Sequence, residues 1–118
     1  MSRAITVYEK PTCSTCKQLG ALLQERGIDF ETVDYQVFPL TESEIRTLVE
    51  KTGEPASRLF RAREPIYVEL GLGERDVSDD EASALMAEHP ALMQRPVVER
   101  GNRAVLARPV ERALELFD

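Results

Sequence analysis

AITVYEKPTCSTCKQLGALL, residues 4–23, decides the fold, because a strand pattern changes into a helix pattern within it. Ala4 to Glu9 alternates apolar and polar residues and is rich in β-branched side chains, which predicts a strand. Pro11-Thr12 breaks that pattern. Leu19, Leu22 and Leu23 then recur at helical spacing, and Gly27 follows the last helical residues. This predicts a helix of about 12 residues with a left-handed glycine cap. The motif Cys13-Ser14-Thr15-Cys16 therefore lies on a turn from a strand into a helix.

The segments that follow continue this alternation of strands and helices. Residues 28–35 predict a second strand, so the first third of the chain is β-α-β, which implies a parallel pair of strands. Capping boxes at Thr41–Glu44 and Ser78–Glu81 predict two helix starts. The prolines and glycines between them predict short helices and loops.

The last part of the chain predicts two more strands and a helix. Pro96–Glu99 and Ala104–Ala107 flank a short turn that contains Gly and Asn, which predicts an antiparallel hairpin. Pro109 suits the first turn of a final helix. We therefore expect an α/β thioredoxin-like fold, with a mixed four-stranded sheet flanked by helices. Residues 1–118 are expected to form a single domain, with a helical insertion at about 41–92.

Charge and hydropathy narrow the class of partner. The 21 acidic and 15 basic residues give a formal net charge of −6, which argues against a nucleic-acid or anionic-membrane partner. No uninterrupted apolar run exceeds four residues, so no transmembrane helix is expected. Residues 1–3 lead straight into strand-like sequence without a secretory signal, and a cytoplasmic location is therefore expected.

The two cysteines predict thiol chemistry. The cytosol keeps thiols reduced, so a pair three positions apart indicates a redox-active or metal-binding site rather than a structural disulfide. A zinc site would need two further ligands, and the chain has only one His, so no metal is expected. A helix N-terminus lowers the pKa of a thiol, which makes Cys13 the reactive residue. Cys16 lies close enough to attack a sulfur bonded to Cys13.

The same helix start predicts an anion site. The N–H groups that follow Cys13, with the hydroxyls of Ser14 and Thr15, can surround a tetrahedral oxyanion. Guanidinium groups would complete such a site, because they stay protonated and match paired oxygens. The chain has twelve arginines, and spacing alone does not select among them.

Several motifs give the chain a family likeness. It resembles the glutaredoxin-linked arsenate reductases and the related Spx-like regulators from Ile5 to Phe117. The motifs that carry the resemblance are Val7-Tyr8, Pro11-Thr12-Cys13, Leu59-Phe60-Arg61, Tyr67-Val68-Glu69-Leu70-Gly71-Leu72, His89-Pro90, Gln94-Arg95-Pro96 and Ala107-Arg108-Pro109.

The resemblance implies a substrate, a mechanism and a set of site residues. Cys13 would be the nucleophile that forms an arsenocysteine adduct with arsenate, and Arg61, Arg95 and Arg108 would bind the oxyanion. No tightly bound cofactor is implied; glutathione with glutaredoxin, or thioredoxin, would be the external reductant. Thioredoxin-like folds also share a cis proline before the third strand, so we expect the bond from Arg95 to Pro96 to be cis.

Two residues depart from the reductase pattern. Glu9 replaces a His that commonly precedes the nucleophile, and its negative charge would raise the pKa of the thiol if it came close. Cys16 replaces a Ser, which gives the C-x-x-C form seen in Spx-like regulators. We hypothesise that Cys16 is either a resolving thiol, leaving a Cys13–Cys16 disulfide, or a buried replacement for that Ser.

Two other functions are alternatives to the reductase. A Spx-like regulator would bind RNA polymerase and use the disulfide as a switch, and a general thiol oxidoreductase would act on disulfides or glutathione conjugates. The complete set of three arginines favours the reductase. His89 is interpreted as a hydrogen-bonding residue at a helix end, and the acidic run from Glu74 to Glu81 as a helix start rather than a cation site.

Overall fold

The computed structural model describes residues 4–117. Residues 1–3, which the sequence places before the first strand, lie outside the described residues, as does residue 118. The elements are, in chain order, β1 (Ile5–Glu9), α1 (Ser14–Glu25), β2 (Glu31–Asp34), α2 (Glu42–Thr52), η1 (Ala56–Leu59), α3 (Pro65–Glu69), α4 (Asp79–Glu88), η2 (Pro90–Leu92), β3 (Val97–Arg100), β4 (Arg103–Leu106) and η3 (Val110–Phe117), where η denotes a 3-10 helix.

The chain divides into two compact units. The first contains the described residues up to Phe38 and those from Arg95 onward, and the second is Pro39–Gln94. The first unit carries all four strands of the sheet, and the second is built from helices and loops. No helix among residues 4–117 is long and apolar enough to cross a membrane.

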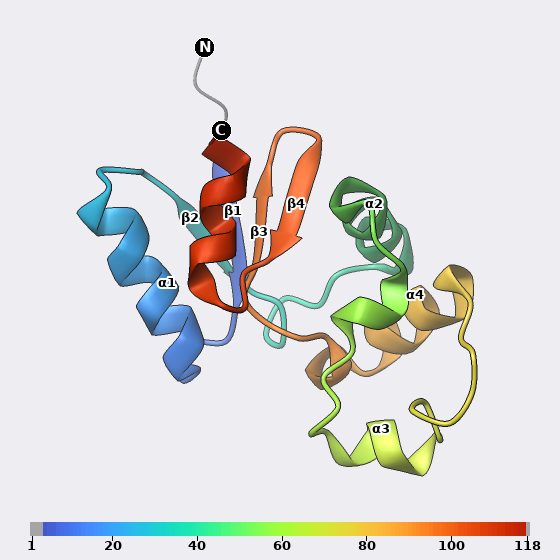
Figure 1. Cartoon of the computed structure of the whole chain (residues 1–118). Helices are drawn as coiled ribbons and strands as arrows, with labels where there is room; N and C mark the ends of the chain where they lie inside the picture. Colours follow the sequence, from blue (N-terminus) through green and yellow to red (C-terminus); the bar gives the residue numbers. More distant parts are fainter. Residues whose placement is uncertain (1–3, 118) are drawn as a thin grey trace. The chain divides into compact units, whose positions relative to one another are not determined.

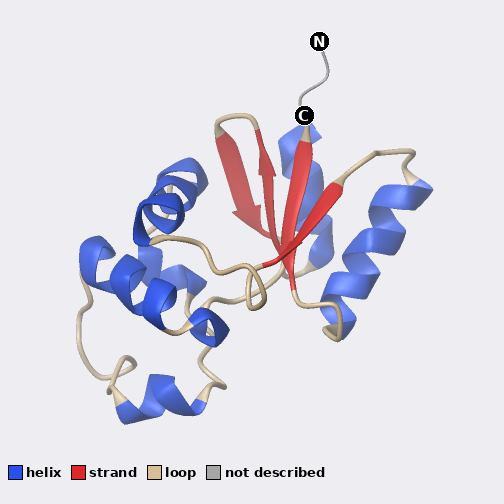
Figure 2. Ribbon diagram, turned by 180° about the vertical axis from the view of Figure 1, so that it is seen from behind, coloured by secondary structure: helices blue, strands red, loops and turns tan. Residues whose placement is uncertain are grey.

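The sheet of the first unit has the order β2-β1-β3-β4 (Figures 1 and 2). β1 pairs in parallel with β2 and antiparallel with β3, and β3 pairs antiparallel with β4. The expected mixed four-stranded sheet is therefore confirmed. The expected hairpin is confirmed, but its turn is shorter than expected, because Arg100 pairs with Arg103 and leaves only Gly101 and Asn102 as the turn. Gly101 has a φ of 61°, which glycine adopts at little cost.

Helices α1 and η3 pack together against one face of this sheet (Figure 1). Leu19 and Leu23 of α1 are fully buried there, one helical turn apart, and each contributes about 1.5–3 kcal/mol of hydrophobic burial. The other buried members of this core are Ile5, Val7, Val98, Val105, Ala107, Ala113 and Leu116. This packing fixes α1 on the sheet and, with it, the turn that carries the cysteines.

The strand register determines which residues gather near that turn. Glu9 at the end of β1 lies beside Asp34 at the end of the parallel strand β2. Tyr8 lies beside Val97 at the start of the antiparallel strand β3. The segment after β1, the segment after β2 and the segment before β3 therefore meet at one edge of the sheet. Those three segments carry the cysteine motif, Tyr35 and Arg95 respectively.

The second strand is shorter than expected. It begins at Glu31 rather than at Ile28, because the Ile28 amide donates to the carbonyl of Leu23 and so belongs to the end of α1. Ile28 and Phe30 are still partly buried against the core of the first unit. Their apolar character reflects packing beside the helix end rather than strand pairing.

In the second unit, the Thr41 capping box is confirmed. Thr41 Oγ1 accepts from the Glu44 amide at 3.1 Å, and the Glu44 carboxylate accepts from the Thr41 amide at 3.0 Å. Ser78 also caps its helix, accepting from the Glu81 amide at 3.1 Å, but the Glu81 carboxylate pairs with Arg75 at 3.0 Å. Both helix starts lie where the sequence predicts them.

Candidate active site

Cys13 is the N-cap residue of α1. Its backbone is extended, with φ −79° and ψ 122°, and its Sγ accepts a hydrogen bond from the Cys16 amide at 3.4 Å. The Cys13 carbonyl accepts from the Lys17 amide, the first hydrogen bond of the helix. The sulfur thus takes the place that a Ser or Asp oxygen commonly occupies at a helix start. A negative charge on that sulfur is favoured by the helix dipole.

The environment of Cys13 favours the thiolate. Burial of this half-buried side chain opposes ionisation and raises the pKa of Cys13. The Cys16 thiol and amide donate hydrogen bonds to the sulfur, and Arg95 adds a hydrogen bond and a positive charge. These contacts outweigh burial, so the pKa of Cys13 is lowered. Cys13 lies at the helix start as expected, and its reactivity stays a prediction. A thiolate is the form in which cysteine acts as a nucleophile.

Arg95 is a buried cation, with a side chain that contacts both Cys13 and Tyr35. Only 6% of the residue is exposed. Burial alone would lower its pKa, but the charges and hydrogen bonds of Tyr35 and Cys13 raise it, so the guanidinium stays protonated. Its carbonyl oxygen accepts a hydrogen bond from Nη1 of Arg108 at 2.8 Å. Two of the three predicted arginines are therefore in direct contact.

Tyr35 is the site residue that the sequence reasoning missed. It directly follows β2, is 2% exposed, and its hydroxyl is hydrogen-bonded to Arg95. Burial raises the pKa of Tyr35 to about 12, against an opposing effect of Arg95, so the hydroxyl is neutral at physiological pH. Its position at the end of a strand parallel to β1 was the available signal, because the carboxyl ends of parallel strands share one edge of the sheet.

The pKa of Cys16 is shifted in the opposite direction to that of Cys13. It is 2% exposed, and burial, its hydrogen bond to Cys13 and the charges of Cys13 and Glu9 raise its pKa to about 12. Cys16 therefore remains a thiol and donates its S–H to the Cys13 sulfur. The charge of Glu9 raises the pKa of Cys16, whereas the pKa of Cys13 is lowered on balance. Burial and the neighbouring Asp34 raise the pKa of Glu9 itself.

The remaining predicted residues lie in two places. Ser14 and Thr15 form the first turn of α1, with Ser14 exposed and Thr15 half-buried, and their contact with an oxyanion stays a prediction. Arg61 belongs to the second unit. There its Nε pairs with the Glu64 carboxylate at 3.1 Å, and its Nη1 donates to the Gln94 side-chain oxygen at 3.1 Å. Its role in anion binding also stays a prediction.

The peptide bond between Arg95 and Pro96 is cis, as expected from the sequence. The bond between Arg108 and Pro109 is also cis, which the sequence reasoning did not anticipate. Each of the two arginines in contact thus directly precedes a cis proline.

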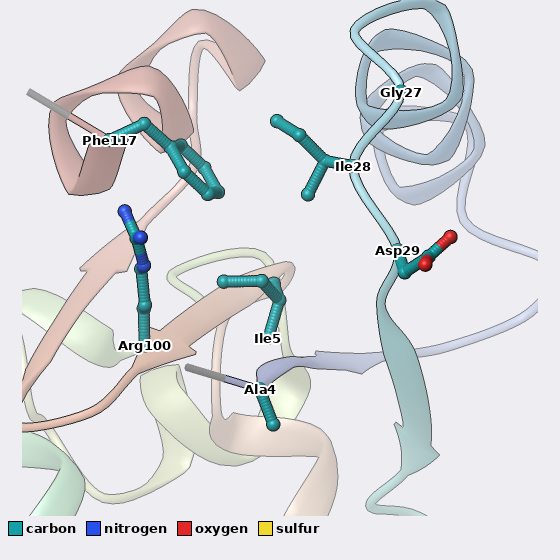
Figure 3. A pocket seen from close by; sticks show the side chains of 7 residues that line it. All are labelled: Ala4, Ile5, Gly27, Ile28, Asp29, Arg100 and Phe117. Carbon is teal, nitrogen blue, oxygen red and sulfur yellow. The ribbon is translucent and has the colours of Figure 1, made fainter. Parts of the chain in front are cut away.

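A cavity of about 470 Å³ lies at the other end of β1 from Cys13 (Figure 3). Figure 3 shows the Phe117 ring beside Ile28 and the Arg100 guanidinium, and the Arg100 guanidinium lies 4.7 Å from the ring centre. The walls contain neither cysteine. This cavity is therefore separate from the reactive thiol.

Among residues 4–117, no three or more His, Cys, Asp or Glu side chains are grouped so that they could hold a metal ion. The acidic residues Asp79, Asp80 and Glu81 form the first turn of α4, in agreement with their interpretation as a helix start. His89 is the C-cap residue of the same helix, and its amide donates to the Leu85 carbonyl.

Comparisons with known proteins identify a consistent group of relatives. A family model described as the ArsC family matches residues 8–116. An arsenate reductase from Neisseria meningitidis serogroup A is 35% identical over 108 residues, covering 91% of this chain and 92% of the relative. An arsenate reductase from Haemophilus influenzae is 30% identical over 115 residues, covering 97% of this chain and 99% of the relative.

The solved structures agree with the sequence comparisons. An arsenate reductase structure from Vibrio cholerae superimposes with a TM-score of 0.88 at 34% identity, and the match covers 98% of both chains. This similarity, together with the sheet order, confirms the expected thioredoxin-like α/β fold.

Proposed function

The chain belongs to the ArsC family, and from that premise we propose that it is an arsenate reductase, an oxidoreductase that converts arsenate to arsenite with thiols as electron donors. The observation that carries the proposal is the Cys13 sulfur at the start of α1, hydrogen-bonded by a buried arginine. This arrangement supplies a nucleophile and a cation to the same small volume. Reduction of a tetrahedral oxyanion by a thiol needs a nucleophile that attacks it and a cation that binds it.

The first step is attack by the Cys13 thiolate on the arsenic atom. A sulfur–arsenic bond forms, the bond from arsenic to one arsenate hydroxyl breaks, that hydroxyl takes up a proton from solvent and leaves as water, and arsenic stays in the pentavalent state. Arg95 reduces the repulsion between the thiolate and the anionic substrate, because its guanidinium is charged and already beside the sulfur. The N-terminal amides of α1 favour negative charge at the same point.

The resemblance to the reductases implies further binding residues. Arg61 and Arg108 are proposed to bind the arsenate oxygens together with Arg95, and Ser14 and Thr15 to donate hydrogen bonds to them. In support, Arg108 already contacts the Arg95 backbone within the first unit. Guanidinium groups suit this role because each presents paired N–H donors to paired oxygens.

The second step is attack by another thiol on the Cys13 sulfur. The sulfur–arsenic bond breaks, its electron pair stays with arsenic to give the trivalent state, and a disulfide forms. Cys16 or an external thiol, such as glutathione, is proposed for this attack. The charge of Cys13 contributes to the raised pKa of Cys16. Adduct formation removes that charge from the sulfur, so Cys16 becomes easier to ionise when a resolving thiol is required.

The disulfide is then reduced by an external system. We propose glutaredoxin with glutathione, or thioredoxin, and a cytoplasmic location where such reductants operate. The protein is proposed to work without a tightly bound cofactor. The alternative of a Spx-like regulator is not favoured, because relatives and solved structures that match nearly the whole chain are named arsenate reductases.

The test is arsenate-dependent oxidation of NADPH, measured separately with a thioredoxin system and with a glutaredoxin and glutathione system. The proposal predicts turnover with at least one system for the wild-type protein and none for Cys13→Ser. Absence of turnover with both systems would overturn the arsenate assignment. Omission of arsenate is the control for background oxidation of NADPH.

A further inference from the structure

Tyr35 and Arg95 approach Cys13 from opposite sides of β1. Tyr35 directly follows β2, which pairs with one edge of β1, and Arg95 comes just before β3, which pairs with the other edge. Both side chains are almost fully buried. They are hydrogen-bonded to each other, and Arg95 is hydrogen-bonded to Cys13. Tyr35, Arg95 and Cys13 thus form a continuous chain of contacts at the end of the sheet where β1 and β2 finish and β3 begins.

A hydrogen bond to one side of a guanidinium group can fix the orientation of the whole group. Its N–H donors lie in one plane at fixed angles, so a partner on one edge determines where the other edge points. The Tyr35 oxygen accepts from Arg95, and the remaining donors are then aimed in a defined direction. Arg108 restrains the backbone of the same residue by donating a hydrogen bond to the Arg95 carbonyl.

We propose that Tyr35 is a positioning residue, whose hydroxyl holds the guanidinium of Arg95 toward the Cys13 sulfur and the oxyanion bound there. The effect on arsenate rests on the proposed function, whereas the effect on the Cys13 thiolate does not. Tyr35 acts through Arg95 and has no direct part in bond making. A tyrosine that only filled space in the core would have no need for its hydroxyl.

The charged and titratable neighbours are consistent with this role. Arg95 and Cys16 face Cys13; Arg95 and Cys16 also face Tyr35; Glu9 acts on Cys16. Because burial raises the pKa of Tyr35 to about 12, its hydroxyl stays neutral over the range in which Cys13 ionises. A change in the pH profile of Cys13 in Tyr35→Phe would therefore result from the lost hydrogen bond and not from a lost titration of Tyr35.

The test is the pH dependence of Cys13 alkylation by iodoacetamide, followed by peptide mass spectrometry. Tyr35→Phe keeps the ring and removes the hydroxyl. The matched control is Tyr8→Phe, which removes a hydroxyl that donates to Glu99 on the same sheet. We expect Tyr35→Phe to slow alkylation at neutral pH about threefold to tenfold, the factor set by one lost hydrogen bond, and to shift the profile to higher pH. Tyr8→Phe should match the wild type.

A double-mutant cycle separates positioning from packing. In an Arg95→Ala background, Tyr35→Phe should have no further effect on Cys13 alkylation, because its target is gone. An unchanged profile for Tyr35→Phe, or equal effects in both backgrounds, would overturn the proposal whether or not the thermal stability falls. The same variants assayed with arsenate should show a raised KM. If the wild type does not reduce arsenate, the alkylation cycle still decides the role of Tyr35.

Discussion

Arg108 donates a hydrogen bond from Nη1 to the carbonyl oxygen of Arg95 at 2.8 Å. One arginine expected at the oxyanion site therefore holds the backbone of another. Arg95 in turn contacts the Cys13 sulfur, so the position of the cation beside the thiolate depends on residues just after β4, just before β3 and at the N-cap of α1.

Removal of Arg108 should lower stability as well as activity. Arg108→Ala leaves the part-buried Arg95 carbonyl without this donor, which costs about 1–3 kcal/mol of the free energy of unfolding. Urea denaturation measures this change. The matched control is Arg103→Ala, because Arg103 is exposed on β4 and its loss should change stability by less than about 0.5 kcal/mol. Equal effects of the two substitutions would contradict the role of Arg108.

Removal of the Arg95 guanidinium should make Cys13 less reactive. Arg95→Ala takes away a charge and a hydrogen bond that lower the pKa of Cys13, so the thiolate population at neutral pH should fall. We expect alkylation of Cys13 to slow about tenfold or more at neutral pH, since a charged hydrogen bond is lost. Arg95→Lys should recover only part of the rate, because an ammonium lacks the planar fork. Wild-type reactivity in Arg95→Ala would disprove the contact.

Arg61 offers a contrast with Arg95. The contacts that lower the pKa of Cys13 come from Cys16 and Arg95, so Arg61→Ala should leave the pH profile of Cys13 alkylation unchanged. If the family resemblance assigns Arg61 correctly, the same substitution should raise the KM for arsenate. Measuring both quantities on one preparation separates thiol activation from substrate binding. An unaltered KM would remove Arg61 from the proposed site.

Stability should fall in alkaline solution. Cys16 has a pKa raised from its ordinary value of 9.0 to about 12, and Tyr35 has one raised from 10.0 to about 12. Above pH 9.0 the unfolded chain releases these protons before the folded protein does, so the stability present below that pH is lost progressively up to about pH 12. Melting temperatures should therefore drop across this range. Cys16→Ser and Tyr35→Phe should each flatten the decline, and parallel curves for all three proteins would refute the assignment.

The role of Cys16 can be tested by mass spectrometry. If Cys16 resolves the adduct, wild-type protein treated with arsenate in the absence of glutathione should contain a Cys13–Cys16 disulfide and release arsenite. Cys16→Ser should stop at the adduct and need external thiol to continue. Glu9→Gln should accelerate disulfide formation, because the charge of Glu9 raises the pKa of Cys16. No disulfide in the wild type would leave Cys16 as a buried donor to Cys13.

Local patterns in the sequence predicted much of the fold. The change from strand to helix around Pro11, the capping residues Thr41 and Ser78, and the hairpin around Gly101 each leave a short-range signature. Strand β2 was misjudged at its start because an apolar residue such as Ile28 can be buried beside a helix end as well as within a strand. Hydrophobic periodicity indicates which side chains are buried, but it does not indicate which backbone groups are hydrogen-bonded to each other.

The site was only partly predictable for a related reason. Cys13 could be identified from its turn, but Arg95 and Arg108 were nominated by family resemblance, since spacing does not single out any of the twelve arginines. Tyr35 reaches the site through the pairing of β2 with β1, and its contact with Arg95 also requires β3 on the other side of β1. Such contacts depend on the order of strands in the sheet, which no single segment encodes.

The central claim, that this chain reduces arsenate through the Cys13 thiolate, is tested most directly by quantifying arsenite. Wild type, Cys13→Ser and Cys16→Ser should each be incubated with arsenate, glutathione, glutaredoxin and thioredoxin, and the arsenic species separated and measured. The account predicts many arsenites formed per wild-type chain, background levels for Cys13→Ser, and substantial turnover for Cys16→Ser with glutathione present. Arsenite production by Cys13→Ser at the wild-type rate, or none by the wild type, would contradict it.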